Sequence, residues 1–429
     1  MIHIRSAQPL AVSLVDLDVR AALYHPWVYL TSGIERTFVE LLRRSRHDWT
    51  IFTHHHSPGT TYPELADARI EVLSPQVTVR RSLLPLLQAT RAISNAQLPA
   101  DAGEALLVSS EGLGDFILNR APMPAVCFCH TPLKILHDEQ TRAALRASSP
   151  VKYAASRALA PAFTAADRRM WRRYRHVFAN SRETQRRIGT AGLANPEQVE
   201  VLAPGVDPDR FAGVASLRRR PGLFLVAGRI MWQKNIELAI DAIAEARADG
   251  VDVELVVAGA VDEKSKPYLQ SLQARAAGLP VIFEANPSDE RMTHLYLSAT
   301  ALVFTPRNED WGMVPLEAMA AGTPVISVDN GGPRESIVDQ VTGWLLPPDP
   351  VRFAEQIGRV AVAHERDLAV LRQAARDHAQ GFGWDRFVAR VDDVMEHVAG
   401  SRAVAPPAMP PRTRRTATSL PRPEATAER

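Results

Sequence analysis

Two carboxylates, Glu309 and Glu317, lie eight residues apart in the segment RNEDWGMVPLEAMAAG. The apolar run TALVFTP before this segment predicts a strand. Pro315 and Gly322 suit the first turn and the C-terminal cap of a helix that follows. The loop between them therefore lies at the carboxyl end of a strand and leads into a helix N-terminus. Open α/β sheets bind ligands at this position, and free backbone N–H groups there favour anions such as phosphate.

A carboxylate can accept hydrogen bonds from neighbouring hydroxyls, as an acidic residue does for a nucleotide ribose. Gly312 would let a ligand approach the backbone between the two acids. Two carboxylates beside a phosphate site fit a ligand with hydroxylated rings on both sides of a diphosphate, as in a nucleotide sugar. The alternative is that one acid caps the helix and the other lies on its surface.

Two cations follow another expected strand in LFLVAGRIMWQKNIELAI, where Arg229 comes directly after the strand and Lys234 stands at a helix start. Cations are disfavoured at a helix N-terminus, so a lysine there is better explained if an anion lies between. Arg229 can contact phosphate with two N–H groups, and Lys234 can act as a point charge. A solvated arginine and lysine are the alternative, but the glutamate loop in the same domain favours a phosphate site.

The elements that position these residues alternate between short apolar runs and amphipathic helical patterns, as in parallel, doubly wound α/β sheets. Because one core rarely grows beyond ~250–300 residues, a chain of 429 residues predicts two domains. Pro and Gly cluster in APGVDPDRFAGVASLRRRPG, near the expected boundary. We expect a first domain over 1–205, a second over 206–381, an amphipathic helix over 382–399 that packs back toward the first domain, and a disordered tail over 400–429.

The net charge is only +2, but residues 1–205 hold 24 Lys and Arg against 18 Asp and Glu, whereas residues 206–399 hold 20 against 28. These opposite signs suggest different partners for the two domains.

Cys127 and Cys129 would point to one face of a strand, so a disulfide framework is not expected, which suits a reducing cytosol. No signal peptide or spanning apolar run is recognisable, so we expect a cytoplasmic protein, with the inner face of the membrane as one possible place.

The basic excess is densest over residues 152–187, with ten basic and two acidic residues. Met170, Trp171 and Tyr174 lie among its arginines at helical spacing. A basic amphipathic helix can lie on anionic lipid, which would give peripheral membrane contact. Equally, the aromatic residues can pack in the core while the arginines are solvated. Nucleic acid is not an expected partner, because the rest of the chain is not basic.

The stretch NEDWGMVPLEAMAAGTPVISVDNGGPRESI resembles the signature of retaining glycosyltransferases of family four, which have the GT-B fold of two Rossmann-like domains facing a cleft. AGRIMWQKNIELAIDA resembles the phosphate loop of that family. FCHTP, ANSRETQRRI and APGVDPDRF are similar to its N-domain and linker segments, so the resemblance covers most of residues 10–398. The sequence around GMVPLEAM and GGPRESI is most similar to that of mannosyltransferases of lipid-linked oligosaccharide assembly and their bacterial relatives.

The resemblance implies that Arg229 and Lys234 hold the donor diphosphate, that Glu317 binds the ribose and that Glu309 binds the transferred sugar. His130 should face the cleft near the sugar, although a turn histidine satisfied by local backbone is the alternative. Further donor contacts are implied for Gly33, Asn286, Trp311, Gly312, Met313 and Val314.

The implied reaction moves a hexose from a nucleotide sugar to a glycan or polyprenyl-linked hydroxyl, with retained configuration and without a metal or other cofactor. Mannose from GDP-mannose is the first expectation, and UDP-dependent glucosyl or N-acetylhexosaminyl transfer is the alternative. Front-face attack by the acceptor would need no separate base, because the leaving phosphate can take the proton. Double displacement would need a carboxylate nucleophile, for which Glu309 is the candidate.

Two departures from the family pattern affect these expectations. Ser32 precedes Gly33 where the family has two glycines, so its side chain could restrict the loop or acceptor access. Ala285 stands where the family has glycine near the base, which leaves the identity of the base open.

Two further patterns in the sequence imitate metal-binding sites. Asp16 and Asp18 imitate a metal-binding Asp-x-Asp but fall in an expected strand, and His54–His56 would point to alternate faces. The same fold also hosts nucleotide-sugar epimerases and non-catalytic sugar-binding scaffolds. An epimerase needs an acid/base pair at the sugar that the sequence does not reveal, and a scaffold would not need the acids and cations that are present.

Overall fold

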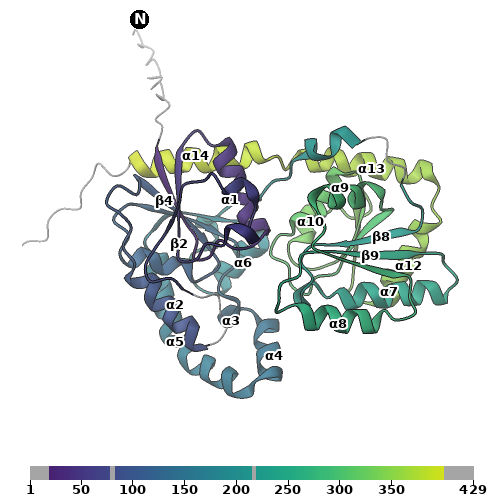
Figure 1. Ribbon diagram of the computed structural model, residues 1–429, viewed down its shortest axis with the longest axis horizontal. Coiled ribbons are helices and arrows are strands. Elements are labelled where there is room, and N and C mark those ends of the chain that lie inside the picture. The colour runs from purple at the N-terminus through teal and green to yellow at the C-terminus, as the bar shows by residue number, and fades with distance from the viewer. Residues whose placement is uncertain (1–18, 78–82, 215–218, 401–429) are drawn as a thin grey trace, which may run out of the picture.

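The computed structural model describes residues 19–77, 83–214 and 219–400, which form two α/β domains (Figure 1). Asp16 and Asp18, with the strand expected around them, and residues 401–429 lie outside the described parts. Within the described parts, no helix is both long and apolar enough to cross a lipid bilayer.

The first domain contains a parallel sheet of seven strands in the order β3-β2-β1-β4-β5-β6-β7. Its central strands are buried on both faces, which explains why they read as continuous apolar runs rather than as alternating patterns. The strands are β1 Arg20–Tyr24, β2 Asp48–Thr53, β3 Ile70–Val72, β4 Ala105–Ser110, β5 Ala125–Cys129, β6 Tyr174–Ala179 and β7 Glu200–Val201.

The second domain contains a parallel sheet of six strands in the order β10-β9-β8-β11-β12-β13. In both sheets the order reverses beside the first strand of the domain, as in doubly wound folds. The strands are β8 Leu223–Ala227, β9 Glu254–Gly259, β10 Val281–Ala285, β11 Ala301–Phe304, β12 Val325–Val328 and β13 Gly343–Leu346. The predicted α/β fold class, with two Rossmann-like domains, is confirmed.

Helices cover both faces of each sheet, and each face has its own apolar cluster. The helices of the first domain are α1 Gly33–Arg44, α2 Leu83–Asn95, α3 Lys134–His137, α4 Glu139–Ser148, α5 Pro150–Trp171 and α6 Arg182–Thr190. Those of the second are α7 Ile236–Ala248, α8 Lys266–Arg275, α9 Asp289–Ser298, α10 Met313–Ala320, α11 Pro333–Ser336, α12 Pro350–Ala361 and α13 Glu365–Gln380. Short 3₁₀ turns are η1 Pro58–Thr60, η2 Pro63–Leu65, η3 Gly114–Asn119, η4 Pro196–Gln198, η5 Pro208–Val214 and η6 Trp232–Lys234.

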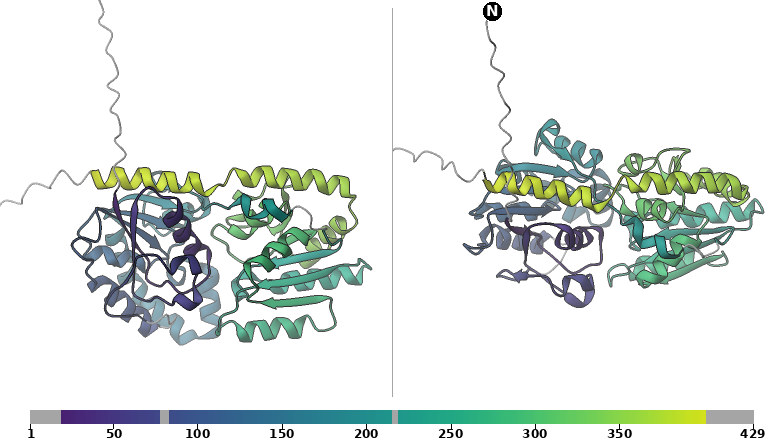
Figure 2. Two further views of the ribbon diagram at one scale, coloured as in Figure 1. Left: turned by 45° about the horizontal axis from the view of Figure 1, so that its top comes forward. Right: turned by 90° about the horizontal axis from the view of Figure 1, so that it is seen from above.

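The last helix, α14 Trp384–Gly400, follows the second domain in sequence but packs on the first (Figure 1). Figure 2 shows α13 and α14 as two consecutive helices along one side of the molecule, each over a different domain. The Phe387 ring lies 5.2 Å from that of Phe128 in β5 and 5.4 Å from that of Trp384. The C-terminal helix therefore completes the core of the N-terminal domain.

The chain crosses between the domains at two adjacent segments. The Val206 N–H donates to the Phe382 carbonyl at 2.8 Å, and Val206 pairs with Gly383 in a parallel bridge. A Cβ atom on Gly205 would lie 2.7 Å from the Trp384 nitrogen. Glycine is therefore needed there because the two crossing backbones are in direct contact.

Of the two interpretations of Met170, Trp171 and Tyr174, contact with lipid or packing in the core, the structure shows the second. Helix α5 ends at Trp171, and strand β6 begins at Tyr174. Met170 and Trp171 are buried, and the Tyr174 hydroxyl hydrogen-bonds Asp115. These three side chains therefore fill the core beside β5 and β6 and are not free to contact lipid.

Candidate active site

The segment that carries the two acids forms a strand, a loop and a helix. Strand β11 ends at Phe304, and α10 begins at Met313. Gly312, just before the helix, has φ of +88°, and a Cβ there would lie 3.3 Å from the Phe304 ring. A larger residue would be strained in this backbone conformation and crowded against the ring. Glycine therefore allows the chain to turn sharply from the Glu309 loop into the first turn of α10.

Glu309 and Lys234 form an ion pair in this site. Lys234 Nζ lies 2.7 Å from Glu309 Oε2, and the two side chains are only 19% and 21% exposed. The Lys234 ammonium also lies 5.4 Å from the centre of the Phe304 ring. Burial favours the neutral acid, but Lys234 outweighs it and holds the pKa of Glu309 below its ordinary value. Glu309 is therefore a carboxylate at neutral pH, able to accept hydrogen bonds.

The loop with the two cations lies against the N-terminus of α10. A Cβ on Gly228 would lie 3.4 Å from a Val314 methyl group, and the Arg307 N–H donates to the Gln233 carbonyl at 2.9 Å. Lys234 itself lies in η6, one residue before the cap of α7. The Arg229 guanidinium has no hydrogen-bond partner among the described residues. The structure thus brings both cations to the loop that carries Glu309.

Glu317 lies one turn into α10, on the same segment as Glu309. Its carboxylate accepts a hydrogen bond from the buried hydroxyl of Tyr296 at 2.6 Å. Burial and the Glu317 charge together raise the pKa of Tyr296 well above its ordinary value, so this hydroxyl keeps its proton. One carboxylate oxygen is thus fixed by the protein, and the side chain is oriented by a partner that sequence reasoning did not find.

Gly33 and Met313 face each other across the domain interface. A Cβ on Gly33 would lie 2.9 Å from Met313 Sδ, and Met313 packs against the apolar clusters of both domains. Ser32 is the N-cap of α1: its hydroxyl accepts from Ile34 N at 3.2 Å and donates to Glu35. Serine at position 32, where the family has glycine, thus stabilises the start of α1 by capping it.

His130 follows β5 and is buried in the first domain. Its Nε2 lies 2.8 Å from Ser109 Oγ, and its ring packs on Phe128 with centres 4.9 Å apart. Burial, helped by His25, lowers the pKa of His130 to about 3. The imidazole is therefore neutral near pH 7 and can donate or accept a hydrogen bond, but it is a poor proton acceptor.

Two other candidate residues are fixed by local contacts. Asn286 adopts φ of +52°, and its side-chain oxygen accepts from Val261 N at 2.9 Å, which ties the loops after β9 and β10 together. The Trp311 indole is buried and donates to the Pro204 carbonyl at 3.3 Å. Its side chain thus packs against the domain-crossing segment, which leaves only backbone groups of Trp311 for a ligand.

Several residues of this interface were not expected to act in the site. Lys134 and Arg187 of the first domain both bind Asp310, the neighbour of Glu309. Glu335 of the second domain binds backbone N–H groups of α6. These residues lie in or next to motif segments of the sequence, but nothing local to any of them indicates that they meet across the domains.

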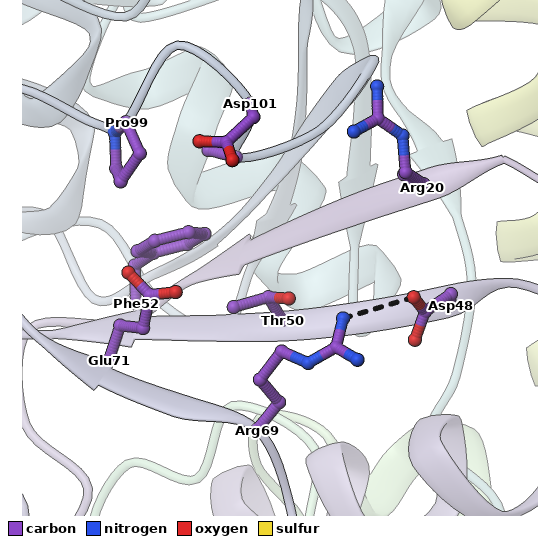
Figure 3. Close-up of a pocket in the computed structure, with 9 residues that line it drawn as sticks. Arg20, Asp48, Thr50, Phe52, Arg69, Glu71, Pro99 and Asp101 are labelled. Atoms are coloured by element: carbon purple, nitrogen blue, oxygen red, sulfur yellow. Dashed lines mark hydrogen bonds and ion pairs between the residues drawn. The ribbon is translucent and has the colours of Figure 1, made fainter.

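Neither metal-ligand clusters nor the small pocket of Figure 3 offers a competing site. Among the described residues, no group of three or more His, Cys, Asp or Glu side chains could hold a metal ion, and His54–His56 form no such group. The pocket has a volume of about 190 Å³ and includes an Asp48–Arg69 ion pair of 3.1 Å. It lies where β1 and β2 begin, whereas Glu309 follows the carboxyl end of its strand.

Two parallel-sheet domains, with acids and cations gathered at strand ends where the domains meet, define the GT-B class of proteins. A sequence model of the family described as Glycosyltransferase Family 4 matches residues 31–210, and one of Glycosyl transferases group 1 matches residues 211–377. Together the two matches cover both domains. The chain belongs to these glycosyltransferase families.

Relatives and solved structures agree with this assignment. The human alpha-1,3/1,6-mannosyltransferase ALG2 is 41% identical over 147 residues, which are 32% of this chain and 35% of ALG2. A D-inositol 3-phosphate glycosyltransferase of Frankia alni is 34% identical over 230 residues, 49% of this chain and 56% of the relative. The chain thus matches about a third to a half of the length of these curated relatives.

Two solved structures show the same fold at low sequence identity. Sucrose-phosphate synthase from Thermosynechococcus elongatus has a TM-score of 0.69 at 19% identity, with 89% of this chain and 99% of that one covered. Anabaena Alr3699/HepE, solved with UDP and glucose, has a TM-score of 0.65 at 18% identity, with 88% and 99% covered.

Proposed function

We propose that the protein is a retaining glycosyltransferase that moves a hexose, in the first instance mannose from GDP-mannose, to a hydroxyl of a glycan or lipid-linked acceptor. The observation that carries this proposal is the Lys234–Glu309 ion pair beside the N-terminus of α10. A donor diphosphate would bind Arg229 and Lys234, which would release Glu309 to accept hydrogen bonds from the sugar. Glu317 would bind the ribose hydroxyls through its remaining carboxylate oxygen.

In the proposed reaction, the acceptor hydroxyl oxygen forms a bond to the anomeric carbon on the face that the diphosphate leaves. The bond between that carbon and the diphosphate oxygen breaks, and the leaving phosphate takes the hydroxyl proton. The products are the glycoside and a nucleoside diphosphate. Arg229, Lys234 and the helix N-terminus would stabilise the leaving charge without a metal. Removing one such preorganised donor typically costs about 10²–10³ in rate.

The choice of mannose is supported by the name of the ALG2 relative, an alpha-1,3/1,6-mannosyltransferase. UDP-glucose is the alternative, because Anabaena Alr3699/HepE was solved with UDP and glucose. The loop around Asn286 would meet the base.

Peripheral membrane contact during action on a lipid-linked acceptor is also a proposal. It rests on the first half of α5, where Lys152, Arg157, Val151 and Leu159 are all exposed. Co-sedimentation with vesicles of anionic and of neutral lipid would test it. Binding that is equal for both kinds of vesicle, or absent from both, would contradict it.

A donor panel tests the main proposal. Purified protein is incubated with GDP-mannose, UDP-glucose or UDP-N-acetylglucosamine and with extracted lipid acceptors, and nucleotide release and product configuration are measured. We expect turnover with GDP-mannose and an α-linked product from the α-linked donor. The proposal fails if no donor across a wide panel binds or reacts, and an inverted product would reject the retaining mechanism.

Glu309→Gln and Lys234→Ala give the corresponding site test. Each is expected to lower kcat by about 10²–10³, because each removes a charge that acts on the donor. Circular dichroism and thermal unfolding would show that the fold persists. Arg334→Ala is a matched control, since Arg334 is 57% exposed and its side chain binds only Asp329 in the part of the chain that the structure describes. Wild-type rates in both site variants would reject the assignment of these residues.

A further inference from the structure

Helix α6 of the first domain holds the loop of the second domain that carries Glu309. The Arg187 guanidinium donates to the Asp310 carboxylate and to the Asn308 side-chain oxygen, which flank Glu309 on either side. Ser181, the N-cap of α6, donates its hydroxyl to the Asp310 carbonyl at 2.6 Å. Main-chain and side-chain atoms of this loop are thus fixed from one helix.

Helix α3 and the start of α4 hold the same loop from a second direction. Lys134 Nζ lies 2.6 Å from Asp310 Oδ2, and the Asn308 amide donates to Asp138. Burial disfavours the Lys134 charge, but Asp310 outweighs it and raises the pKa of Lys134 above its ordinary value. The Asp310 side chain is 14% exposed and forms ion pairs with both Lys134 and Arg187. Removing either partner therefore leaves a largely buried carboxylate with less charge compensation.

The segment behind Glu309 is also docked on α6. The Gly332 N–H donates to the Glu309 carbonyl at 3.1 Å, and a Cβ on Gly331 would lie 2.3 Å from that oxygen. Three residues after Gly332, the Glu335 carboxylate accepts from the N–H groups of Arg182 and Glu183, both at 2.8 Å. Both segments that determine the position of Glu309 are therefore tied to α6.

The nucleotide side of the site is built differently. Lys234, Arg229, Glu317 and the Tyr296 hydroxyl that orients Glu317 all belong to the second domain. Their positions depend on the sheet and helices of that domain, whereas the Glu309 loop also depends on contacts with the first domain.

We propose that Arg187 is a positioning residue, which places Glu309 for the donor sugar when the first domain is docked. Docking would then complete the sugar half of the site while leaving the nucleotide half unchanged. Specificity for the sugar would be coupled in this way to the arrangement of the domains. This inference rests on the proposed function in its assignment of Glu309 to the sugar.

Arg187→Ala tests the inference, with Arg186→Ala as its matched control. Arg186 lies on the same helix, is 64% exposed and, among the described residues, binds only Glu183. Binding of GDP and of GDP-mannose is measured by calorimetry, together with kcat. For Arg187→Ala we expect an unchanged Kd for GDP, a Kd for GDP-mannose raised about tenfold, and kcat lowered by up to about 10² because the reacting groups are misplaced.

Rescue by the conservative variant separates positioning from folding. Arg187→Lys keeps the charge but replaces the planar guanidinium with a single ammonium nitrogen, so it should recover part of the GDP-mannose affinity. Arg186→Ala should match the wild type. Equal weakening of GDP and GDP-mannose in Arg187→Ala would overturn the inference, as would wild-type behaviour.

A second measurement does not depend on the donor. Hydrogen exchange of backbone amides over residues 307–312 is followed in the ligand-free protein. We expect faster exchange in Arg187→Ala and in Asp310→Asn, but not in Arg186→Ala. Unchanged exchange in both variants would overturn the inference. If the wild type binds no nucleotide sugar, the proposed function fails, while this readout still decides whether α6 holds the loop.

Discussion

At the scale of single residues, the site contains acids that differ in how the protein holds them. Glu309 is paired with Lys234, and Glu317 with a neutral tyrosine hydroxyl. Neither contact resembles an acid/base couple, because the pKa of Glu309 is lowered rather than raised toward neutrality. The pair is therefore better suited to accept hydroxyl hydrogen bonds than to move protons.

His130 gives a prediction on stability against pH. Its pKa is lowered to about 3 in the fold but is about 6.5 in an unfolded chain, so the unfolded state binds a proton more readily between these values. Stability from this residue is therefore complete above about pH 7 and falls as the pH drops through 6.5. Integrated from about pH 7.5 to about pH 5, the loss is about 2 kcal/mol.

Urea unfolding at both pH values checks this prediction in the wild type and in His130→Gln, which keeps a hydrogen-bonding side chain but cannot titrate. The free energy of unfolding should fall less with acid in the variant. Other buried histidines, such as His54, titrate in both proteins and cancel in the comparison. Equal pH dependence in the two proteins would mean that the pKa of His130 is not lowered by folding.

At the scale of elements, α14 follows the second domain in sequence but forms part of the first domain, so the first and last described elements share one core. Its buried face packs on the sheet of the first domain, while α13 before it packs on the second. Arg390 of α14 also forms an ion pair with Glu200 of β7 at 2.8 Å. The stability of the N-terminal domain therefore depends on residues that follow the second domain in sequence.

Phe387→Ala should destabilise the first domain by about 3–5 kcal/mol, because it removes a ring that is 2% exposed and leaves a cavity between Phe128 and Trp384. Arg386→Ala, an exposed change on the same helix, is the control and should have an effect within about 0.5 kcal/mol. Urea unfolding followed by tryptophan fluorescence measures both. A small effect of Phe387→Ala would contradict the assignment of α14 to this core.

At the scale of the whole molecule, the relation between the domains is set by the crossing segments and by α6. The crossing backbones touch at Gly205, and α6 fixes the Glu309 loop and Glu335. A change at the crossing segments should therefore alter the position of the Glu309 loop, although no side chain of the site is replaced.

Gly205→Ala should shift the domains, because the new methyl group would lie 2.7 Å from the Trp384 nitrogen and the two backbones must separate. Gly383→Ala is the matched control, since a methyl group there meets nothing within 4 Å. Fluorescence energy transfer between dyes on Arg157→Cys and Ala248→Cys, one in each domain, measures the distance. The native cysteines are buried and should not react. Equal transfer in Gly205→Ala and Gly383→Ala would show that the crossing tolerates the methyl group.

The sequence by itself determined the strand-loop-helix junction of Glu309 and Glu317 and the cations after β8. It also determined the alternation of strands and helices. These features depend on local patterns and on a known motif, and a residue's place at the end of a strand follows from its neighbours in the chain. The α/β fold class and the glycosyltransferase family could be predicted on these grounds.

Only the tertiary structure decided which residues meet across the domains. Arg187 and Asp310 lie 123 residues apart, and nothing local to either indicates its partner. The burial of Met170 and Trp171 and the use of Ser32 as a cap were settled in the same way, by packing and geometry that no single segment contains. Contacts between distant segments depend on how two completed sheets dock, and docking is a property of surfaces that exist only after each domain has folded.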